Sequence, residues 1–147
     1  MKDGGDIRLC ADYKVTVNRY LKDVKHPLPR INELFSQLHG EFFTKLDFAY
    51  AYNQLEFEES TRYLLTWSTH RGIYAVNRLH FGTKPACSIF QKTVEKVLQG
   101  VNGTVIFLDD IVVTGKSCKD HLHNLSEVFY RLSKAGFKLN LKKCRFF

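Results

Sequence analysis

The feature that most constrains this chain lies in residues 105–113, where Asp109 and Asp110 stand between two short runs of apolar, mostly β-branched residues. Such runs form strands that are buried on at least one face. Adjacent carboxylates at a buried junction are unfavourable, because like charges repel and loss of water penalises each ion. The run contains no Lys or Arg, so a bound Mg²⁺ or Mn²⁺ is the simplest compensation. The segment therefore indicates a metal-dependent, nucleotidyl-transfer type of chemistry.

A simple hairpin turn is the alternative interpretation of Asp109 and Asp110. Asp is common in turns, and the two flanking runs are able to pair as antiparallel strands. Two-residue hairpin turns favour Asn-Gly or Asp-Gly, because these turns need positive φ angles, so Asp-Asp fits less well. The segment alone does not decide between the two interpretations.

The composition is that of one ordinary globular domain with a basic surface. The chain has 147 residues, of which 44% are hydrophobic and 25% charged, so it is long enough to bury a core. It has no apolar run of membrane-spanning length and no signal-like start. We therefore expect no membrane partner, and a cytoplasmic or nuclear location instead of secretion. The net charge of +7 favours a polyanionic partner such as nucleic acid.

The cysteines do not form a recognisable metal or disulfide framework. There are four, widely spaced and without a Cys-x-x-Cys pair, which is typical of free thiols in a reducing compartment. Cys118, His121 and His123 suggest a small zinc site. Because no second pair of ligands accompanies them, a solvated helix start is the favoured interpretation.

Hydrophobic periodicity and turn residues predict alternating strands and helices. Strands are expected over residues 7–10, 42–46, 63–68, 73–79 and 137–141, besides the Asp-Asp hairpin. Helices are expected over residues 30–38, ended by Gly40, over 85–99, and from a capping box at 117–120 to Gly136, with an irregular connector over 22–29. Mixed elements with antiparallel pairs predict an α+β fold.

Asp47 is the candidate for a third carboxylate. Two-metal phosphoryl transfer needs carboxylates from separate elements, because one short segment cannot hold two ions. Asp47 directly follows the expected strand 42–46. For an isolated Asp at a strand end, a turn or cap role is the alternative.

Three segments in sequence order resemble the catalytic motifs of reverse transcriptases: residues 43–55, 79–91 and 107–110. Residues 8–18 and 121–147 resemble the fingers segment and the palm end of gypsy-type LTR-retrotransposon polymerases. The resemblance covers essentially the whole chain. It implies a polymerase palm, an antiparallel sheet backed by helices, with partial fingers.

The same resemblance implies a domain organisation. Residues 1–147 would be a single reverse transcriptase domain fragment, with fingers roughly over 1–40 and 58–80 interleaved with the palm. The thumb, connection and RNase H would be absent. We therefore expect a piece of a larger retroelement polyprotein, located in a cytoplasmic virus-like particle or in the nucleus.

By resemblance, the site residues hold metal ions and act in RNA-directed DNA synthesis. Asp47, Asp109, Asp110 and the backbone carbonyl of Phe48 would hold two Mg²⁺ ions, for which Mn²⁺ is a possible substitute. The substrates would be deoxynucleoside triphosphates and an RNA or DNA template with its primer.

Further residues would bind the nucleotide or the template. Arg8 would clasp the triphosphate, Tyr52 would exclude a 2′-hydroxyl, and Phe81 with Gly82 would lie under the base and sugar. The remaining three predicted contacts, with template or primer, are Lys84, Phe107 and Leu108. For Arg8, Tyr52 and Lys84 the alternatives are a solvated strand-edge arginine, a core tyrosine and a solvent-facing lysine.

Three positions depart from the usual family pattern. His80 stands where Pro is usual, Cys87 where Pro or another small residue is common, and Phe107 where Tyr is commoner. An inactive nucleic-acid-binding remnant of a retroelement polymerase is therefore the main rival hypothesis. A nucleotide cyclase is a weaker rival, because Tyr52 and Phe81 serve selection of a templated deoxynucleotide.

Overall fold

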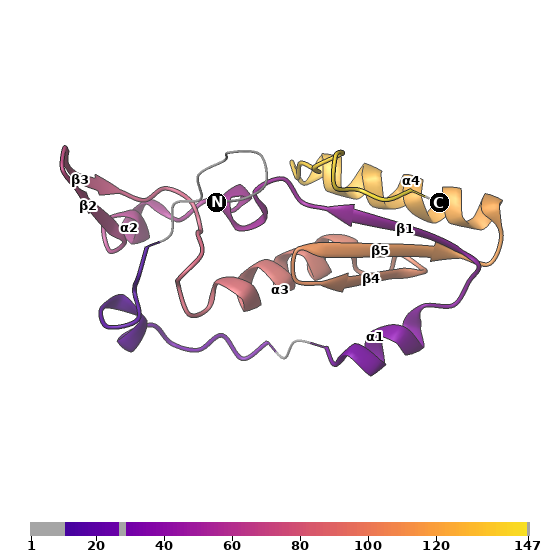
Figure 1. The fold of residues 1–147 in the computed structure, drawn as a ribbon, viewed down its shortest axis with the longest axis horizontal. Coiled ribbons are helices and arrows are strands. Elements are labelled where there is room, and N and C mark those ends of the chain that lie inside the picture. The colour runs from indigo at the N-terminus through magenta and orange to yellow at the C-terminus, as the bar shows by residue number, and fades with distance from the viewer. Residues whose placement is uncertain (1–10, 27–28, 147) are drawn as a thin grey trace. The chain divides into compact units, whose positions relative to one another are not determined.

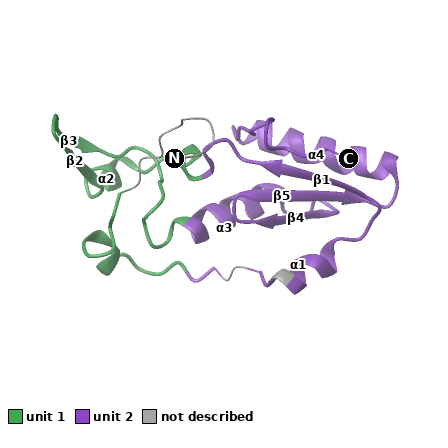
Figure 2. Ribbon diagram, viewed as in Figure 1, with its two compact units in different colours: residues 1–24, 52–86 green, residues 25–51, 87–147 purple. Residues whose placement is uncertain are grey.

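The chain forms two compact units, each built from two separate stretches of sequence (Figure 2). The computed structural model describes residues 11–26 and 29–146. Residues 1–24 and 52–86 form the first unit, and residues 25–51 and 87–147 form the second. Along the described residues, no helix is both long and apolar enough to cross a membrane.

The second unit contains a three-stranded antiparallel sheet in the order β1-β5-β4 (Figure 1). The strands are β1 (Phe42–Asp47), β5 (Asp110–Gly115) and β4 (Thr104–Phe107). Leu46 pairs with Ile111, and both side chains are fully buried. Because side chains alternate along a strand, Asp47 and its partner Asp110 lie on the opposite, more exposed face.

Two helices bury the apolar side of this unit: α3 (Ala86–Leu98) and α4 (Cys118–Lys134). α4 packs against β5 and β1 and buries Val128 and Leu132. α3 buries Phe90, whose ring meets Phe48 edge-on with 5.2 Å between the ring centroids. Each such side chain contributes about 1.5–3 kcal/mol when fully buried, so these contacts fix both helices to the sheet.

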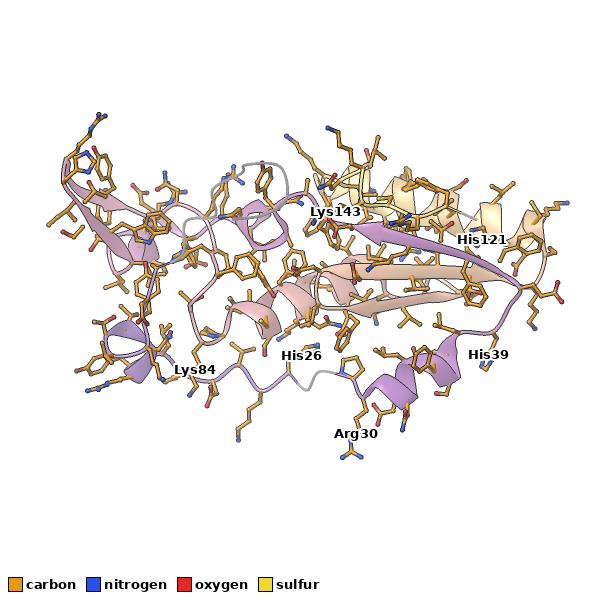
Figure 3. The ribbon with its side chains drawn as sticks, in the orientation of Figure 1. His26, Arg30, His39, Lys84, His121 and Lys143 are labelled. Atoms are coloured by element: carbon orange, nitrogen blue, oxygen red, sulfur yellow. The ribbon has the colours of Figure 1, made fainter. Side chains whose placement is uncertain are left out.

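The start of α4 is held by a cap and by a buried histidine. Ser117 Oγ accepts a hydrogen bond from the backbone N–H of Asp120 at 3.2 Å, which confirms the predicted cap. His121 (Figure 3) is fully buried, with its Nε2 2.8 Å from Thr44 Oγ1 on β1. A Cβ on Gly115 would lie 2.3 Å from the backbone nitrogen of His121. Glycine is therefore required where α4 approaches β5, and His121 serves the core.

The first unit is organised around a cluster of aromatic rings. His80 is buried, with its ring centroid 5.2 Å from that of Tyr13 and 5.4 Å from that of Trp67. Trp67 Nε1–H donates a hydrogen bond to the Tyr13 hydroxyl at 2.8 Å. Burial raises the pKa of Tyr13, although this hydrogen bond acts in the other direction. His80 thus supplies core volume at the position where the resembled motif usually has Pro.

Short elements complete the first unit. The expected strand pair is present but shorter than predicted, as the antiparallel hairpin β2 (Thr66–Thr69) and β3 (Gly72–Ala75). The sequence patterns did not predict α2 (Glu59–Arg62), nor the 3₁₀ turns η1 (Val17–Arg19) and η2 (Ala51–Gln54). The strand expected over 7–10 lies outside the described residues.

The strand predicted over residues 137–141 is wrong. Only an isolated bridge joins Leu139 to Phe48, and a second joins Arg145 to Lys45. The backbone N–H of Arg145 donates to the Lys45 carbonyl at 2.8 Å. A turn between the two bridges interrupts the ladder, so the segment follows the outer edge of β1 without forming a strand.

The role predicted for Gly40 is also wrong. Helix α1 (Ile31–Gln37) confirms the expected helix, but its last turn gives way to an extended conformation at Leu38, before the glycine. A Cβ on Gly40 would lie 2.3 Å from the carbonyl oxygen of Gly115. Gly40 therefore permits close approach to the end of β5 and does not end the helix.

Acid should destabilise the fold through His121. Burial lowers the pKa of His121, and the nearby Asp120 only partly opposes this. The unfolded chain therefore binds a proton more readily than the folded one, so stability falls as the pH drops through about 6.5. We expect His121→Gln to have a smaller loss of melting temperature between pH 7 and pH 5 than the parent, measured by circular dichroism.

The matched control is His123→Gln, because His123 is exposed on the same helix. It should keep the parent's pH dependence. The same loss of melting temperature in His121→Gln and in the parent would contradict the assignment.

Candidate active site

The Asp-Asp segment is a hairpin whose turn contains a strained residue. Phe107 pairs with Asp110 at the ends of β4 and β5, so Leu108 and Asp109 form the connection. Leu108 has a φ of +54°, in a region that residues with bulky side chains rarely adopt. Such strain is about 1–3 kcal/mol and persists only where the surroundings enforce it. The turn interpretation is therefore correct for the backbone, and the carboxylates are held on it.

A second strained residue lies near the other carboxylate segment. Tyr50 has a φ of +52°, and in the described chain it and Leu108 are the non-glycine residues with positive φ. Tyr50 follows Asp47 closely in sequence, as Leu108 precedes Asp109. Backbone strain of this kind clusters at functional sites. Both segments that contain the carboxylates therefore show this feature of a functional site.

The pairing of β1 with β5 places two of the three carboxylates together. Asp47 is directly opposite Asp110 in the register. The backbone N–H of Phe48 donates to the carbonyl of Asp109 at 3.4 Å, so the chain beyond Asp47 is tied to the turn. Like charges directly opposite one another in a sheet destabilise the pair, so this arrangement needs nearby positive charge.

Two lysines outside the β4–β5 hairpin supply that charge. Lys45 Nζ lies 2.8 Å from Asp110 Oδ2, and Lys143 Nζ (Figure 3) lies 3.6 Å from Asp47 Oδ1. Residues 105–113 contain no cation of their own, and the lysines that compensate the carboxylates come from β1 and from the segment after α4. Partly exposed ion pairs of this kind contribute about 0–1 kcal/mol, so they balance the carboxylates only weakly.

The donor chemistry fits a hard divalent cation. Asp47 and Asp110 offer carboxylate oxygens from two strands on one face, and Asp109, whose Oδ1 is buried, lies beside them in the turn. Carboxylate oxygens are the ligands that Mg²⁺ and Mn²⁺ prefer. Among the described residues, no three His, Cys, Asp or Glu side chains are gathered as a metal site. The structure therefore brings together the pair and leaves Asp109 adjacent to it.

In the first unit, Tyr52 and Phe81 form a fixed aromatic pair. Tyr52 is only 3% exposed, and its ring meets Phe81 edge-on with 4.4 Å between the ring centroids. The core role weighed for Tyr52 is therefore present. Its role in excluding a 2′-hydroxyl stays a prediction, which a rigidly packed ring favours.

Asn18 holds the loop that contains Gly82 and Lys84. Its Nδ2 donates to the Gly82 carbonyl at 2.7 Å, and its Oδ1 accepts from the backbone N–H of Lys84 at 2.8 Å. Gly82 has a φ of +103°, and a Cβ there would lie 2.3 Å from the Ala11 carbonyl oxygen. Glycine at position 82 is thus needed because the loop passes close to the backbone of Ala11. Its predicted contact with a nucleotide remains a prediction.

The other predicted contacts have these positions. Lys84 is half-exposed and its Nζ lies 2.8 Å from Asp23 Oδ1, so it is an ion-paired surface lysine. Phe107 and Leu108 are partly buried in the β4–β5 hairpin. Arg8 lies outside the described residues. Binding of triphosphate, template or primer by these residues stays a prediction.

In each unit, one residue that supports a loop with predicted site residues was missed in the sequence. Asn18 was noticed only as part of a longer segment, and Gln91 only as the end of a motif. Gln91 is fully buried on α3 beneath the hairpin turn. A signal existed, because Gln91 occupies the helical stripe of Val94 and Leu98, and a polar residue on a buried stripe needs partners.

Comparison with known proteins gives a family match over the whole chain. The family model for reverse transcriptase (RNA-dependent DNA polymerase) matches residues 1–147. An uncharacterised protein of Caenorhabditis elegans is 40% identical over 146 residues, 99% of this chain and 12% of that protein. The retrovirus-related Pol polyprotein from transposon 412 of Drosophila melanogaster is 38% identical over 143 residues, 95% of this chain and 12% of the polyprotein.

Solved structures are similar in fold. The foamy viral protease-reverse transcriptase in complex with double-stranded DNA gives a TM-score of 0.85 at 20% identity, covering 92% of this chain and 24% of that one. The same viral enzyme in complex with an RNA/DNA hybrid also gives 0.85 at 20% identity, covering 92% of this chain and 18% of that one. The predicted α+β fold of a polymerase palm is confirmed.

Removing Lys45 should make the carboxylate pair more dependent on added cations. In Lys45→Gln, Asp110 loses the ammonium group that lies 2.8 Å from its carboxylate, while Asp47 still stands opposite it. We expect a loss of stability of at most about 1 kcal/mol at low ionic strength. Mg²⁺ should then raise the melting temperature of the variant more than that of the parent, because the ion no longer competes with Lys45.

Thermal unfolding with and without Mg²⁺ measures both effects. Lys92→Gln, at an exposed position of α3, is the control and should respond to Mg²⁺ as the parent does. An equal Mg²⁺ shift in Lys45→Gln and the parent would show that Lys45 does not compete for this site.

Proposed function

Because the chain belongs to the reverse transcriptase family, we propose that it forms the polymerase centre of an RNA-directed DNA polymerase from a retrotransposon. The observation that carries this proposal is the pairing of Asp47 with Asp110 on the open face of the sheet, next to a strained turn that contains Asp109. The chain spans 12% of the length of both relatives described above, so the activity is proposed for the natural protein that contains this segment.

The carboxylates are proposed to hold two Mg²⁺ ions, with Mn²⁺ as a substitute. Asp47, Asp109, Asp110 and the Phe48 carbonyl would be the ligands, and the bound ions would activate the primer 3′-hydroxyl and neutralise the triphosphate. The chain's own contribution is to hold oxygen ligands from two strands in one register. In the absence of metal, Lys45 and Lys143 would balance the charges of Asp110 and Asp47 only in part.

The aromatic pair is proposed to select the nucleotide. A Tyr52 ring packed edge-on against Phe81 cannot rotate away easily, so it would present a fixed surface beneath the sugar. A 2′-hydroxyl would collide with that surface, whereas a deoxyribose would fit. Arg8 is proposed to bind the triphosphate, since a guanidinium makes bidentate contacts with phosphate.

Template and primer are proposed to be RNA or DNA strands that meet Lys84, Phe107 and Leu108. The net charge of +7 supports binding of a polyanion. The similar foamy viral enzyme was solved with double-stranded DNA and with an RNA/DNA hybrid, which supports the same class of partner. The relatives that are transposon polyproteins support a retroelement polyprotein, for which we propose a cytoplasmic virus-like particle or the nucleus.

Asp109→Asn should separate catalysis from binding. We expect primer extension on an RNA template to fall by roughly a hundredfold or more, the scale of losing one charge-stabilising group. Template–primer affinity should change little, because the lost group acts on the reacting phosphates. The measurements are primer extension and fluorescence anisotropy on the complete natural protein that contains this segment.

Glu58→Gln, at an exposed position, is the charge-matched control and should extend normally. Loss of binding together with extension in Asp109→Asn would make Asp109 structural. A parent that binds the template–primer without extending it would instead favour an inactive nucleic-acid-binding remnant.

Tyr52→Val should relax discrimination against ribonucleotides. Shortening the ring opens space for a 2′-hydroxyl, so the ratio of kcat/KM for deoxynucleotide over ribonucleotide should fall roughly tenfold or more. Single-nucleotide incorporation with each substrate measures this ratio. Tyr130→Val, at an exposed tyrosine of α4, is the control, and an unchanged ratio in Tyr52→Val would refute the selection role.

A further inference from the structure

One buried amide on α3 makes hydrogen bonds with the hairpin backbone on both sides of Phe107. Gln91 is fully buried. Its Oε1 accepts from the backbone N–H of Leu108 at 2.8 Å, and its Nε2 donates to the Ile106 carbonyl at 3.0 Å. The Gln91 amide thus provides a hydrogen-bond partner for one backbone N–H and one backbone carbonyl of the hairpin.

The orientation of this amide is itself fixed. Gln91 Nε2 also donates to Glu95 Oε1 at 2.6 Å, one helical turn further along α3. The other oxygen of Glu95 lies 2.6 Å from His26 Nε2 (Figure 3). An amide has two ends of similar shape and opposite hydrogen-bonding character. Two acceptors on the Nε2 side leave Oε1 as the end that faces Leu108.

The turn needs such a partner because its backbone is strained. Leu108 has a φ of +54°, which its own side chain disfavours. A hydrogen bond to the Leu108 N–H holds the peptide in that orientation, and the next residues along the chain are Asp109 and Asp110. The direction in which both carboxylates project therefore depends on the Leu108 conformation.

We infer that Gln91 is a positioning residue for the carboxylate site: its amide holds Leu108 in the positive-φ conformation that aims Asp109 and Asp110. Gln91 binds the hairpin backbone at Ile106 and at Leu108, and it acts on the carboxylates through that backbone. The inference rests on the proposed use of these carboxylates as metal ligands. It assigns Gln91, Glu95 and His26 to the support of that site.

The first test replaces the amide without shortening the side chain. In Gln91→Met, affinity for Mn²⁺, measured by electron paramagnetic resonance of free Mn²⁺, should fall about tenfold or more, as for other residues that orient metal ligands. Gln99→Met, at an exposed position just beyond α3, should bind as the parent does. Equal affinities in Gln91→Met and the parent would overturn the inference.

A second substitution asks whether the effect passes through the Leu108 backbone. Glycine adopts positive φ without side-chain strain. In the Leu108→Gly background, Gln91→Met should therefore weaken Mn²⁺ binding only about two- to threefold, giving a clear interaction between the two sites in a double-mutant cycle. The same tenfold loss in both backgrounds would mean that Gln91 acts through general packing, and would overturn the inference.

A readout without metal separates this inference from the proposed function. Hydrogen exchange at the Leu108 amide should be slow in the parent and faster in Gln91→Met. If the parent and Asp110→Asn bind Mn²⁺ equally, the proposed metal site fails, while slow exchange that depends on Gln91 still supports the hold on the turn. Unchanged exchange in Gln91→Met overturns it.

Should Gln91→Met fail to fold, Glu95→Leu tests the same amide from a position whose side chain is 35% exposed. Removing the Glu95 carboxylate frees the amide to turn, so faster exchange at Leu108 supports the inference. Exchange as slow as in the parent overturns it.

Discussion

The structure of the second unit depends on the register between β1 and β5. Leu46 meets Ile111 in the buried layer, and this pairing determines that Asp47 meets Asp110 on the other face. A shift of one residue would turn the carboxylates into the core and the leucine toward solvent. The free energy of burying apolar side chains thus fixes a pair of like charges in an arrangement that those charges, taken alone, would oppose.

Local patterns in the sequence were sufficient for the elements that carry this arrangement. Alternating or continuous apolar residues predicted β1 and the β4–β5 hairpin, and stripes at helical spacing predicted α3 and α4, because each pattern reflects burial against a single layer. The α+β fold followed from these patterns, whereas the nearness of Asp47 to the Asp-Asp turn was implied by the resemblance to reverse transcriptases. Residues 137–141 were apolar enough to suggest a strand, but a ladder needs a continuous partner, which a local pattern cannot reveal.

The parts that could not be predicted depend on partners distant in the sequence. Lys143 becomes a counter-ion of Asp47 only when the segment after α4 returns along β1. Gly40 is needed only because the chain passes close to Gly115. Likewise Asn18 and Gln91 each satisfy the backbone of a loop far along the chain. In both units an amide from elsewhere supports a loop whose own residues do not specify its conformation.

The segment that follows the outer edge of β1 has a consequence for how such a chain tolerates change in length. The Asp47 carbonyl accepts from the backbone N–H of Asn140 at 2.8 Å, and Lys143 follows in the next turn. β1 is therefore bound along both edges, although it is one of the two edge strands in the order β1-β5-β4. An insertion or deletion just beyond α4 would displace both the hydrogen bond and the ammonium group at Asp47. The segment after α4 should therefore tolerate changes in composition far more readily than changes in length.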